Sequence, residues 1–470
     1  MFTGREISDQ SAARLILAHA LERVLPGPAL RRHLLFDRRA DILFLDGRPY
    51  QLADFPEIWI VGGGKAAALT ATELVRTLGS SRISGILNVY RSQADLPLSK
   101  NIKLVPADHP IPNEAGADGA RQMIELLKHA DCRTLVLALI SGGGSSLMAL
   151  PVEGITLDDY REVNRQLLAV PATIDEVNSV RKHIDQLKGG RMRTFAENAG
   201  GFISLVLSDV PVTSTGLADD PSVIASGPTV GDPSTFFTAK TVLDKYRIWD
   251  QTPAAIKKYL LENIGRDTNE TPAPDSPLLN EGRSQYVIFA NNDQAMAAAA
   301  EKSTELGYAT HLIGGRPGET ALKIQDEVTR EIENILKIVS PYLGPQDRVT
   351  FASFTTDGID GHSDLAGAVA DDDTLRLARS MGLDPERFLS DFDSADFFER
   401  LGLGIAIGPS GTNVADISLV LIRNSERKLA FIFGGETTVA MVLPAGRKPG
   451  RGGRNTHLVL LAAKRLSHFH

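Results

Sequence analysis

The stretch VGGGKAAA, residues 61–68, follows the apolar run EIWI and precedes a segment of good helix formers. Gly62, Gly64 and Ala67 match the loose dinucleotide-binding pattern, in which glycines allow a tight turn and a helix N-terminus attracts an anion. Lys65 lies inside this turn, and no acidic residue able to bind a ribose hydroxyl ends the next run, GILNVYRSQ. The stretch predicts a phosphate-binding turn between a strand and a helix, and it leaves the kind of phosphate open.

Short apolar runs alternate with helical stretches along the first half of the chain. Such alternation predicts crossover units and a mostly parallel sheet with helices on both faces, which is an α/β fold. In that architecture ligands bind outside the carboxyl ends of the strands, so the loops after the runs are where chemistry is expected. The runs are EIWIV (57–61), ISGILNVY (83–90), TLVLALI (134–140) and GFISLVLSDV (201–210).

The length of 470 residues exceeds the size at which single cores usually stop growing, so two domains are expected. Residues 263–285 are polar, contain prolines and lack periodicity, which makes them the candidate linker. Further apolar runs, beginning with YVIFANND at 286–293, predict a second α/β domain. The expected domains are 1–270 and 285–470, with the boundary somewhere in the linker.

Two helix starts are readable between the third and fourth runs, because Thr156 and Thr173 each have an acidic residue at capping-box spacing. The second helix is expected to continue to the glycine pair at 189–190. Asp185 and Lys188 would then lie on one charged, solvent-exposed face of that helix.

The composition excludes several classes of protein. A net charge of -8 argues against nucleic acid as the main partner, because phosphate backbones are bound by a surplus of Lys and Arg. No apolar run approaches the ~20 residues of a membrane span, and the N-terminal helix lacks a signal-peptide core. Cys132 is the only cysteine, which predicts a reducing compartment and an inert, partly buried thiol. We expect a cytoplasmic protein without a membrane partner, and the sequence leaves homo-oligomerisation open.

A second glycine-rich loop, ISGGGSS at 140–146, follows the third run. Its glycines free backbone amides to point at an anion, and its serines add hydroxyl donors. Neither loop is a Walker A motif, because the glycine spacing differs from that of the motif and Ala66 replaces its Ser or Thr. Lys65 can still neutralise phosphoryl oxygens. The cofactor-binding candidates in the two loops are Gly62, Gly63, Gly64, Ser141, Gly142, Gly143, Gly144 and Ser145.

Several acidic residues also follow predicted strands. Asp209 ends the fourth run, Asp357 lies in TTDGIDGHSD, and Glu436 lies in FGGETT. Carboxylates in such loops can hold magnesium or accept a hydroxyl proton, and we take Asp357 and Glu436 as the metal candidates. For Asp360 and Asp364 a turn role is slightly favoured, because Asp–Gly pairs are common in turns.

The glycine turn GRGGRN, residues 450–455, contains Arg451 and Arg454. A guanidinium in such a turn can form two parallel hydrogen bonds with a carboxylate or a phosphate. The alternative is an ordinary solvated basic turn.

Taken in order, these stretches resemble the type II glycerate 2-kinases, whose C-terminal region is called the MOFRL domain. The resemblance implies transfer of the γ-phosphoryl group of ATP, with Mg²⁺, to the 2-hydroxyl of D-glycerate, giving 2-phosphoglycerate. It also implies a cleft between a larger Rossmann-like N-terminal domain and a smaller MOFRL-type one. The matching motifs, from about residue 60 to 457, are GGGKAA, ISGGGSS, EGITL, ATIDEVNSVRKHIDQLKGGR, SDVP, DPSVIASGPT, TDGIDG, GPSGTNV, GGETTV and GRGGRN.

The resemblance also implies roles for single residues. The lysine of the family's first glycine loop falls on Lys65, its strand-end aspartate on Asp209 and its C-terminal arginines on Arg451 and Arg454. We take Lys65, Asp209 and Arg454 as catalytic candidates, and Arg451 with Asn413 of GPSGTNV as cofactor-binding candidates. The segments VPVTSTGLADDP, AVPAT and RNTHL depart from the family pattern, so the exact hydroxy acid stays open.

Two other classes of function remain. An NAD(P)-dependent hydroxypyruvate or tartronate reductase would use the first glycine turn, with Arg91 binding a 2'-phosphate, but it gives the second loop and the acidic loops no role. A non-catalytic sugar-acid or nucleotide-binding protein would leave many charged groups beside glycine turns without a function.

Overall fold

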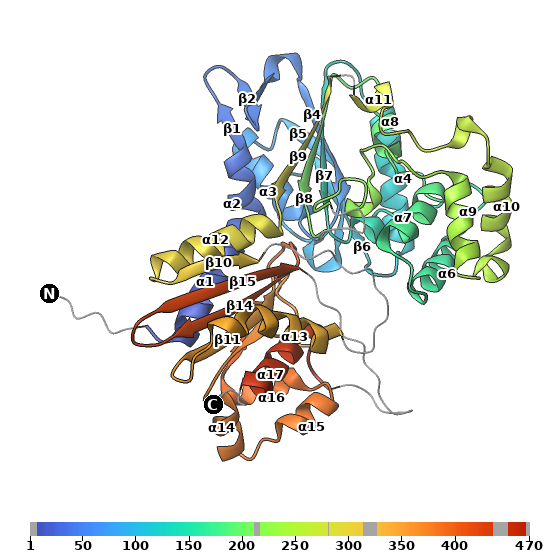
Figure 1. Ribbon diagram of the computed structural model, residues 1–470. Coiled ribbons are helices and arrows are strands. Elements are labelled where there is room, and N and C mark those ends of the chain that lie inside the picture. Colours follow the sequence, from blue (N-terminus) through green and yellow to red (C-terminus); the bar gives the residue numbers. More distant parts are fainter. Residues whose placement is uncertain (1–6, 211–216, 281, 314–326, 436–449, 467–470) are drawn as a thin grey trace. The chain divides into compact units, whose positions relative to one another are not determined.

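The computed structural model describes residues 7–210, 217–280, 282–313, 327–435 and 450–466. Its contacts divide the chain into two compact units, which are described separately (Figure 1). One unit consists mainly of residues 26–290, and the other combines residues up to 25 with those from 291 onward. No helix in the described ranges is long and apolar enough to cross a membrane.

The first unit is built on a six-stranded sheet in which every pair is parallel. Its strands are β4 (Glu57–Gly63), β5 (Ile83–Tyr90), β6 (Ile102–Ala107), β7 (Thr134–Ser141), β8 (Gly201–Leu207) and β9 (Ser284–Ala290). The order β6-β5-β4-β7-β8-β9 is the 3-2-1-4-5-6 order of the doubly wound Rossmann fold. The predicted α/β, Rossmann-like fold class is confirmed, and the strand order reverses between β4 and β7.

Helices cover this sheet on both sides (Figure 1). Every residue of β7 is buried, as expected for a central strand of a parallel sheet. The apolar stripe of α4 packs on one face through residues such as Met123 and Leu127, which join one buried cluster with Val136. A small antiparallel sheet also belongs to this unit. The bounds are α2 (Pro26–His33), α3 (Ala67–Leu78), α4 (Glu114–Lys128), α5 (Gly144–Leu147), α8 (Arg191–Thr194), α11 (Pro277–Asn280), β1 (Leu34–Asp37), β2 (Ile42–Leu45) and β3 (Arg48–Gln51).

Four further helices form a layer with its own apolar core. They are α6 (Leu157–Leu168), α7 (Ile174–His183), α9 (Phe236–Lys245) and α10 (Ala254–Asn263). The predicted capping boxes at Thr156 and Thr173 are confirmed. The predicted extension of the second helix is wrong, because α7 ends at His183. Asp185 and Lys188 are not exposed but form a buried ion pair of 2.6 Å in the turn that follows.

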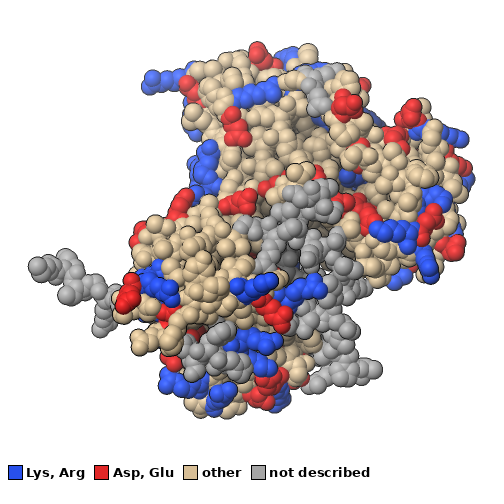
Figure 2. Space-filling view, in the orientation of Figure 1, with Lys and Arg blue, Asp and Glu red and all other residues tan. Residues whose placement is uncertain are grey.

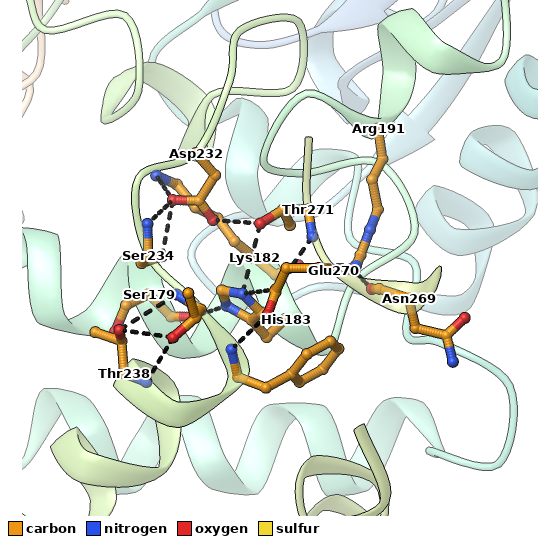
Figure 3. A network of polar contacts seen from close by, with 12 residues as sticks. Ser179, Lys182, His183, Arg191, Asp232, Ser234, Thr238, Asn269, Glu270 and Thr271 are labelled. Carbon is orange, nitrogen blue, oxygen red and sulfur yellow. Dashed lines mark hydrogen bonds and ion pairs between the residues drawn. The ribbon is translucent and has the colours of Figure 1, made fainter. Parts of the chain in front are cut away.

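The expected linker also packs onto this layer. Glu270 accepts a hydrogen bond from the amide of Phe236, and its Oε1 lies 2.6 Å from Nε2 of the buried His183 (Figure 3). In the same network, Thr271 donates to the buried Asp232, which pairs with Lys182. A polar segment without periodicity is thus held by buried polar side chains, so describing it as a linker was wrong for this part.

The run YVIFANND does not open the second unit as predicted. Its strand, β9, pairs in parallel with β8 and forms an edge of the first sheet. Val287 and Phe289 are buried there, so the apolar character that suggested a new domain serves the first sheet instead. The contact division between the units falls after Ala290.

The second unit contains a mixed sheet of order β10-β15-β14-β11-β12-β13. Only the β10–β15 pair is parallel; the other neighbours are antiparallel. This smaller α/β unit was predicted. Its strands are β10 (Ala309–Ile313), β11 (Arg348–Thr355), β12 (Gly367–Asp371), β13 (Gly404–Ile405), β14 (Asp416–Arg423) and β15 (Lys428–Gly435).

The N-terminal helix belongs to this second unit. Its residue Asp9 is buried, accepts a 2.6 Å hydrogen bond from Tyr308 and pairs with Arg423 at 2.9 Å. The sequence does not reveal this long-range grouping. The helices are α1 (Asp9–Val24), α12 (Asn292–Glu305), α13 (Glu327–Val339), α14 (Thr374–Ser380), α15 (Pro385–Ser390), α16 (Ser394–Leu401) and α17 (Arg454–Leu466). Short 3-10 turns are η1 (Leu52–Asp54), η2 (Arg91–Gln93), η3 (Ile224–Ser226), η4 (Trp249–Gln251), η5 (Asp267–Asn269) and η6 (Ser340–Tyr342).

The surface carries both charge signs. On the face in Figure 2, acidic and basic side chains lie interspersed. Cys132 is exposed, which corrects the predicted partial burial. The reason is local, since Cys132 lies in a turn in which Asp131 accepts a hydrogen bond from the amide of Arg133, just before β7 begins.

Candidate functional site

The two glycine loops meet at the point where the strand order of the parallel sheet reverses. The amide of Lys65, after β4, donates a 2.9 Å hydrogen bond to the carbonyl of Gly142, after β7. The amide of Ala66 donates to Oγ of the buried Ser141 at 3.0 Å. Gly64 has φ +141°, and a Cβ there would clash with Ser141. The glycine spacing thus lets two loops pack together where doubly wound folds bind their ligands.

The backbone amides of the two loops differ in their partners. In the first loop the amide of Gly64 bonds to the carbonyl of Asn88, and those of Lys65 and Ala66 bond to the second loop. The glycines at 62–64 allow close packing against β5 and β7, and their role as cofactor-binding residues stays a prediction. In the second loop no acceptor within the described ranges pairs with the amides of residues 143–145. The second loop is thus the better anion site.

Three polar side chains surround the second loop. A Cβ placed on Gly143 would lie 3.3 Å from Cδ2 of His109 and 3.6 Å from Cγ of Lys65. A Cβ on Gly142 would meet the carboxylate of Asp209. These side chains follow β4, β6 and β8, so the carboxyl ends of separate strands place them around one loop. Two residues predicted from the sequence, Lys65 and Asp209, are therefore brought to the predicted glycines.

Sequence reasoning missed His109. It follows the apolar run IKLVPA, and its position after a strand is the signal that could have found it. The rings of Tyr90 and His109 pack edge-on, with 6.0 Å between their centroids. The preceding Asp108 accepts hydrogen bonds from Arg91 at 2.6 and 2.9 Å, and these hold the pKa of Asp108 below its ordinary value. Arg91 is therefore already engaged by a carboxylate.

A second group of residues links α7 to the second glycine loop. Two of its members, Ser226 and Asn178, were not predicted as site residues from the sequence. Oγ of Ser145 lies 2.9 Å from Oγ of Ser226, which donates a 2.9 Å hydrogen bond to Oδ1 of Asn178. Ser226 and Asn178 are buried. Ala225 and Ser226 both have positive φ, at 50° and 63°, which costs ~1–3 kcal/mol for each residue that is not glycine. The surrounding structure must hold this conformation, so the segment is built to place Ser226.

The C-terminal candidates are described within the second unit alone. Arg451 forms two 2.9 Å hydrogen bonds with Glu399, and Arg454 contacts Asp416 at 2.6 and 2.9 Å. The buried Asn413 accepts a hydrogen bond from a backbone amide two residues on. Each arginine thus has a carboxylate partner, and their roles toward a ligand stay predictions.

The acidic loop after β11 has two kinds of carboxylate. Oδ1 of Asp357 accepts hydrogen bonds from the Thr355 hydroxyl and from the amide of residue 359. Asp360 is buried and accepts hydrogen bonds from the amides of Asn455 and Thr456, so it caps α17. Burial raises the pKa of Asp360, and those amides offset part of the effect. Asp360 is therefore structural, as the sequence favoured.

The remaining metal candidate, Glu436, lies outside the described residues. Within the described ranges, no three His, Cys, Asp or Glu side chains group as a metal site.

Two family models match this chain. Residues 12–261 match the family model described as a domain of unknown function (DUF4147), and residues 295–416 match the MOFRL family. Glycerate 2-kinase of Pyrococcus horikoshii is 30% identical over 422 residues, which cover 81% of this chain and 90% of that protein. The chain belongs to the glycerate 2-kinase family. Membership in this family of phosphotransferases confirms the enzyme class predicted from the motifs.

Other relatives of this glycerate 2-kinase family member carry two kinds of name. The crystal structure of a glycerate kinase from Thermotoga maritima has a TM-score of 0.70 and 28% identity, and covers 88% of this chain and 99% of that chain. A protein of Agrobacterium vitis named putative hydroxypyruvate reductase is 34% identical over 396 residues, covering 77% of this chain and 98% of that protein.

Proposed function

We propose that this chain transfers the γ-phosphoryl group of ATP to the 2-hydroxyl of D-glycerate, or of a closely related small hydroxy acid. The observation that carries the proposal is the meeting of two glycine loops at the reversal of strand order, with Lys65, His109 and Asp209 around them. Family membership supplies the reaction class.

The second loop fits a nucleotide phosphate. A phosphate group requires hydrogen-bond donors and positive charge, and loose phosphoryl transfer depends almost entirely on positioning and electrostatic stabilisation. The amides of residues 143–145 supply donors, and Lys65, whose Cγ lies beside Gly143, supplies a cation. When bound, ATP provides the phosphoryl group, and Lys65 stabilises the charge on the transferred oxygens.

Mg²⁺ is part of the proposal. At nucleotide sites it is usually held by one or two carboxylates together with phosphate oxygens and water, so a cluster of three protein ligands is not required. Asp357 and Glu436 stay the proposed protein ligands. Arg454, Arg451 and Asn413 stay proposed contacts for the phosphates or for the acceptor carboxylate.

Asp209 is proposed to orient the reacting hydroxyl and accept its proton. A dissociative transition state needs little push from a base, so Asp209→Asn is expected to lower kcat about 100-fold and leave the Mg²⁺ concentration for half-maximal rate unchanged. Magnesium titrations of the initial rate check this. A large rightward shift in metal dependence would instead make Asp209 a metal ligand, and near-wild-type turnover would remove it from the mechanism.

A second candidate function is an NAD(P)-dependent hydroxypyruvate reductase, which the name of the Agrobacterium vitis relative favours. The residue expected to bind a 2'-phosphate, Arg91, instead pairs with Asp108. We expect ADP release with ATP, Mg²⁺ and D-glycerate in a panel of small hydroxy acids, and no oxidation of NADPH with hydroxypyruvate. The reverse pattern would reject the kinase.

A further inference from the structure

The hydrogen bonds around Ser145 fix the direction in which its hydroxyl hydrogen points. Ser226 has a single hydroxyl hydrogen, and it donates this hydrogen to Oδ1 of Asn178. Nδ2 of Asn178 faces the carbonyl of Val223 at 3.5 Å, which orients the amide with Oδ1 toward Ser226. In the 2.9 Å contact between the two serines, Ser145 must therefore be the donor.

This direction decides which groups Ser145 can bind. Its hydrogen is used inside the protein, so the half-buried Oγ offers only lone pairs to a ligand. Ionised phosphate and carboxylate oxygens carry no hydrogen to donate, so they are unfavourable partners. The hydroxyl donor to phosphate expected at Ser145 is thus replaced by an acceptor, which suits a ligand hydroxyl.

The neighbours of Ser145 narrow the choice of ligand hydroxyl. The carboxylate of Asp209 lies against Gly142 in the same loop, and a carboxylate, unlike this serine, can accept the proton of the reacting hydroxyl. The ribose hydroxyls of ATP are separated from the transferred phosphorus by two further phosphates. The hydroxyl next to the reacting one is therefore the best partner.

We propose that Ser145 accepts a hydrogen bond from the non-reacting hydroxyl of the acceptor, and so selects a 2,3-dihydroxy acid over a 2-hydroxy acid lacking that group. Ser226 and Asn178 act as positioning residues, because they fix the direction of the Ser145 hydroxyl. The inference rests on the proposed kinase function. An unpaired polar group in a desolvated site strongly disfavours a substrate that lacks its partner.

The test compares D-glycerate with D-lactate, which lacks the 3-hydroxyl. We expect Ser145→Ala to lower kcat/KM for D-glycerate about 10- to 100-fold, because the 3-hydroxyl of the bound acceptor is left without a hydrogen-bond partner. The KM for ATP and the Mg²⁺ dependence should stay the same. For D-lactate, kcat/KM should change less than threefold. Where its turnover is too slow to measure, its inhibition constant as a competitive inhibitor of D-glycerate phosphorylation should change less than threefold.

Two further variants separate positioning from general damage. Ser226→Ala frees the Ser145 hydrogen and should also reduce the preference for D-glycerate. Ser146→Ala is the matched control, since the neighbouring Ser146 donates its hydrogen to the Pro110 carbonyl, and its preference should equal that of the wild type.

The outcomes are distinct. An equal loss of kcat/KM for D-glycerate and D-lactate in Ser145→Ala would overturn the proposed role of Ser145. So would a changed dependence on ATP or Mg²⁺ with an unchanged preference for D-glycerate. Neither result would overturn the proposed kinase function. A wild-type enzyme that phosphorylates no hydroxy acid would overturn the proposed function, and this inference with it.

Discussion

Replacement of Lys65 by Ala is expected to lower kcat/KM for D-glycerate by about 30- to 1,000-fold without unfolding the protein. Lys65 follows β4, and its stem lies beside Gly143 in the loop that offers free amides. A fixed cation there stabilises charge that develops only in transfer, and removal of one such preorganised group costs ~2–4 kcal/mol of transition-state stabilisation. Steady-state kinetics at saturating ATP and Mg²⁺, with a thermal melt of each variant, measure both effects.

Two companion variants sharpen the Lys65 experiment. Lys65→Arg should restore little activity, because a planar guanidinium is larger than the compact ammonium of lysine. Lys103→Ala removes a surface lysine whose ammonium donates a hydrogen bond to Gln122, and it should behave as the wild type. Near-normal turnover of Lys65→Ala would show that Lys65 is an ordinary surface residue.

Replacement of Lys188 by Met is expected to destabilise the fold by about 3–5 kcal/mol. Lys188 is 2% exposed and pairs at 2.6 Å with Asp185, which is fully buried. Burial alone would lower the pKa of Lys188, but Asp185 and Tyr160 more than offset this and keep its pKa above the ordinary value. Loss of the lysine leaves the buried Asp185 carboxylate with the amides of Leu150 and Leu187 but without a cation, which is far more costly than loss of a surface pair.

Urea or thermal unfolding measures this effect against a matched pair. Lys128 forms an exposed ion pair with Glu125 at the same spacing of three residues, and Lys128→Met should change the free energy of unfolding by less than about 1 kcal/mol. Similar shifts for the two variants would contradict the importance of the buried pair.

The parallel sheet could be predicted because its strands are short, largely apolar runs with recognisable helix starts between them. The runs 57–61, 134–140 and 201–210 became β4, β7 and β8, and their following loops held Lys65 and Asp209. Residues at carboxyl ends of parallel strands share one edge of the sheet, so local sequence was enough to group them.

Other features depend on partners far away in the sequence. Local pattern placed Asp185 and Lys188 on an exposed helix, because it does not show that the chain leaves α7 at His183 and buries both charges. The strand β9 looked like the start of a new domain, because about 80 residues separate it from β8, the strand with which it pairs. His109 carried no motif of its own and became visible only beside Gly143.

Phosphoryl transfer to the 2-hydroxyl of the acceptor is tested by ³¹P NMR of the product. The wild-type enzyme is incubated with D-glycerate, ATP and Mg²⁺, and the product is compared with authentic 2-phosphoglycerate and 3-phosphoglycerate. We expect 2-phosphoglycerate to form in step with ADP. Exclusive formation of 3-phosphoglycerate, or no phosphorylated product, would contradict it.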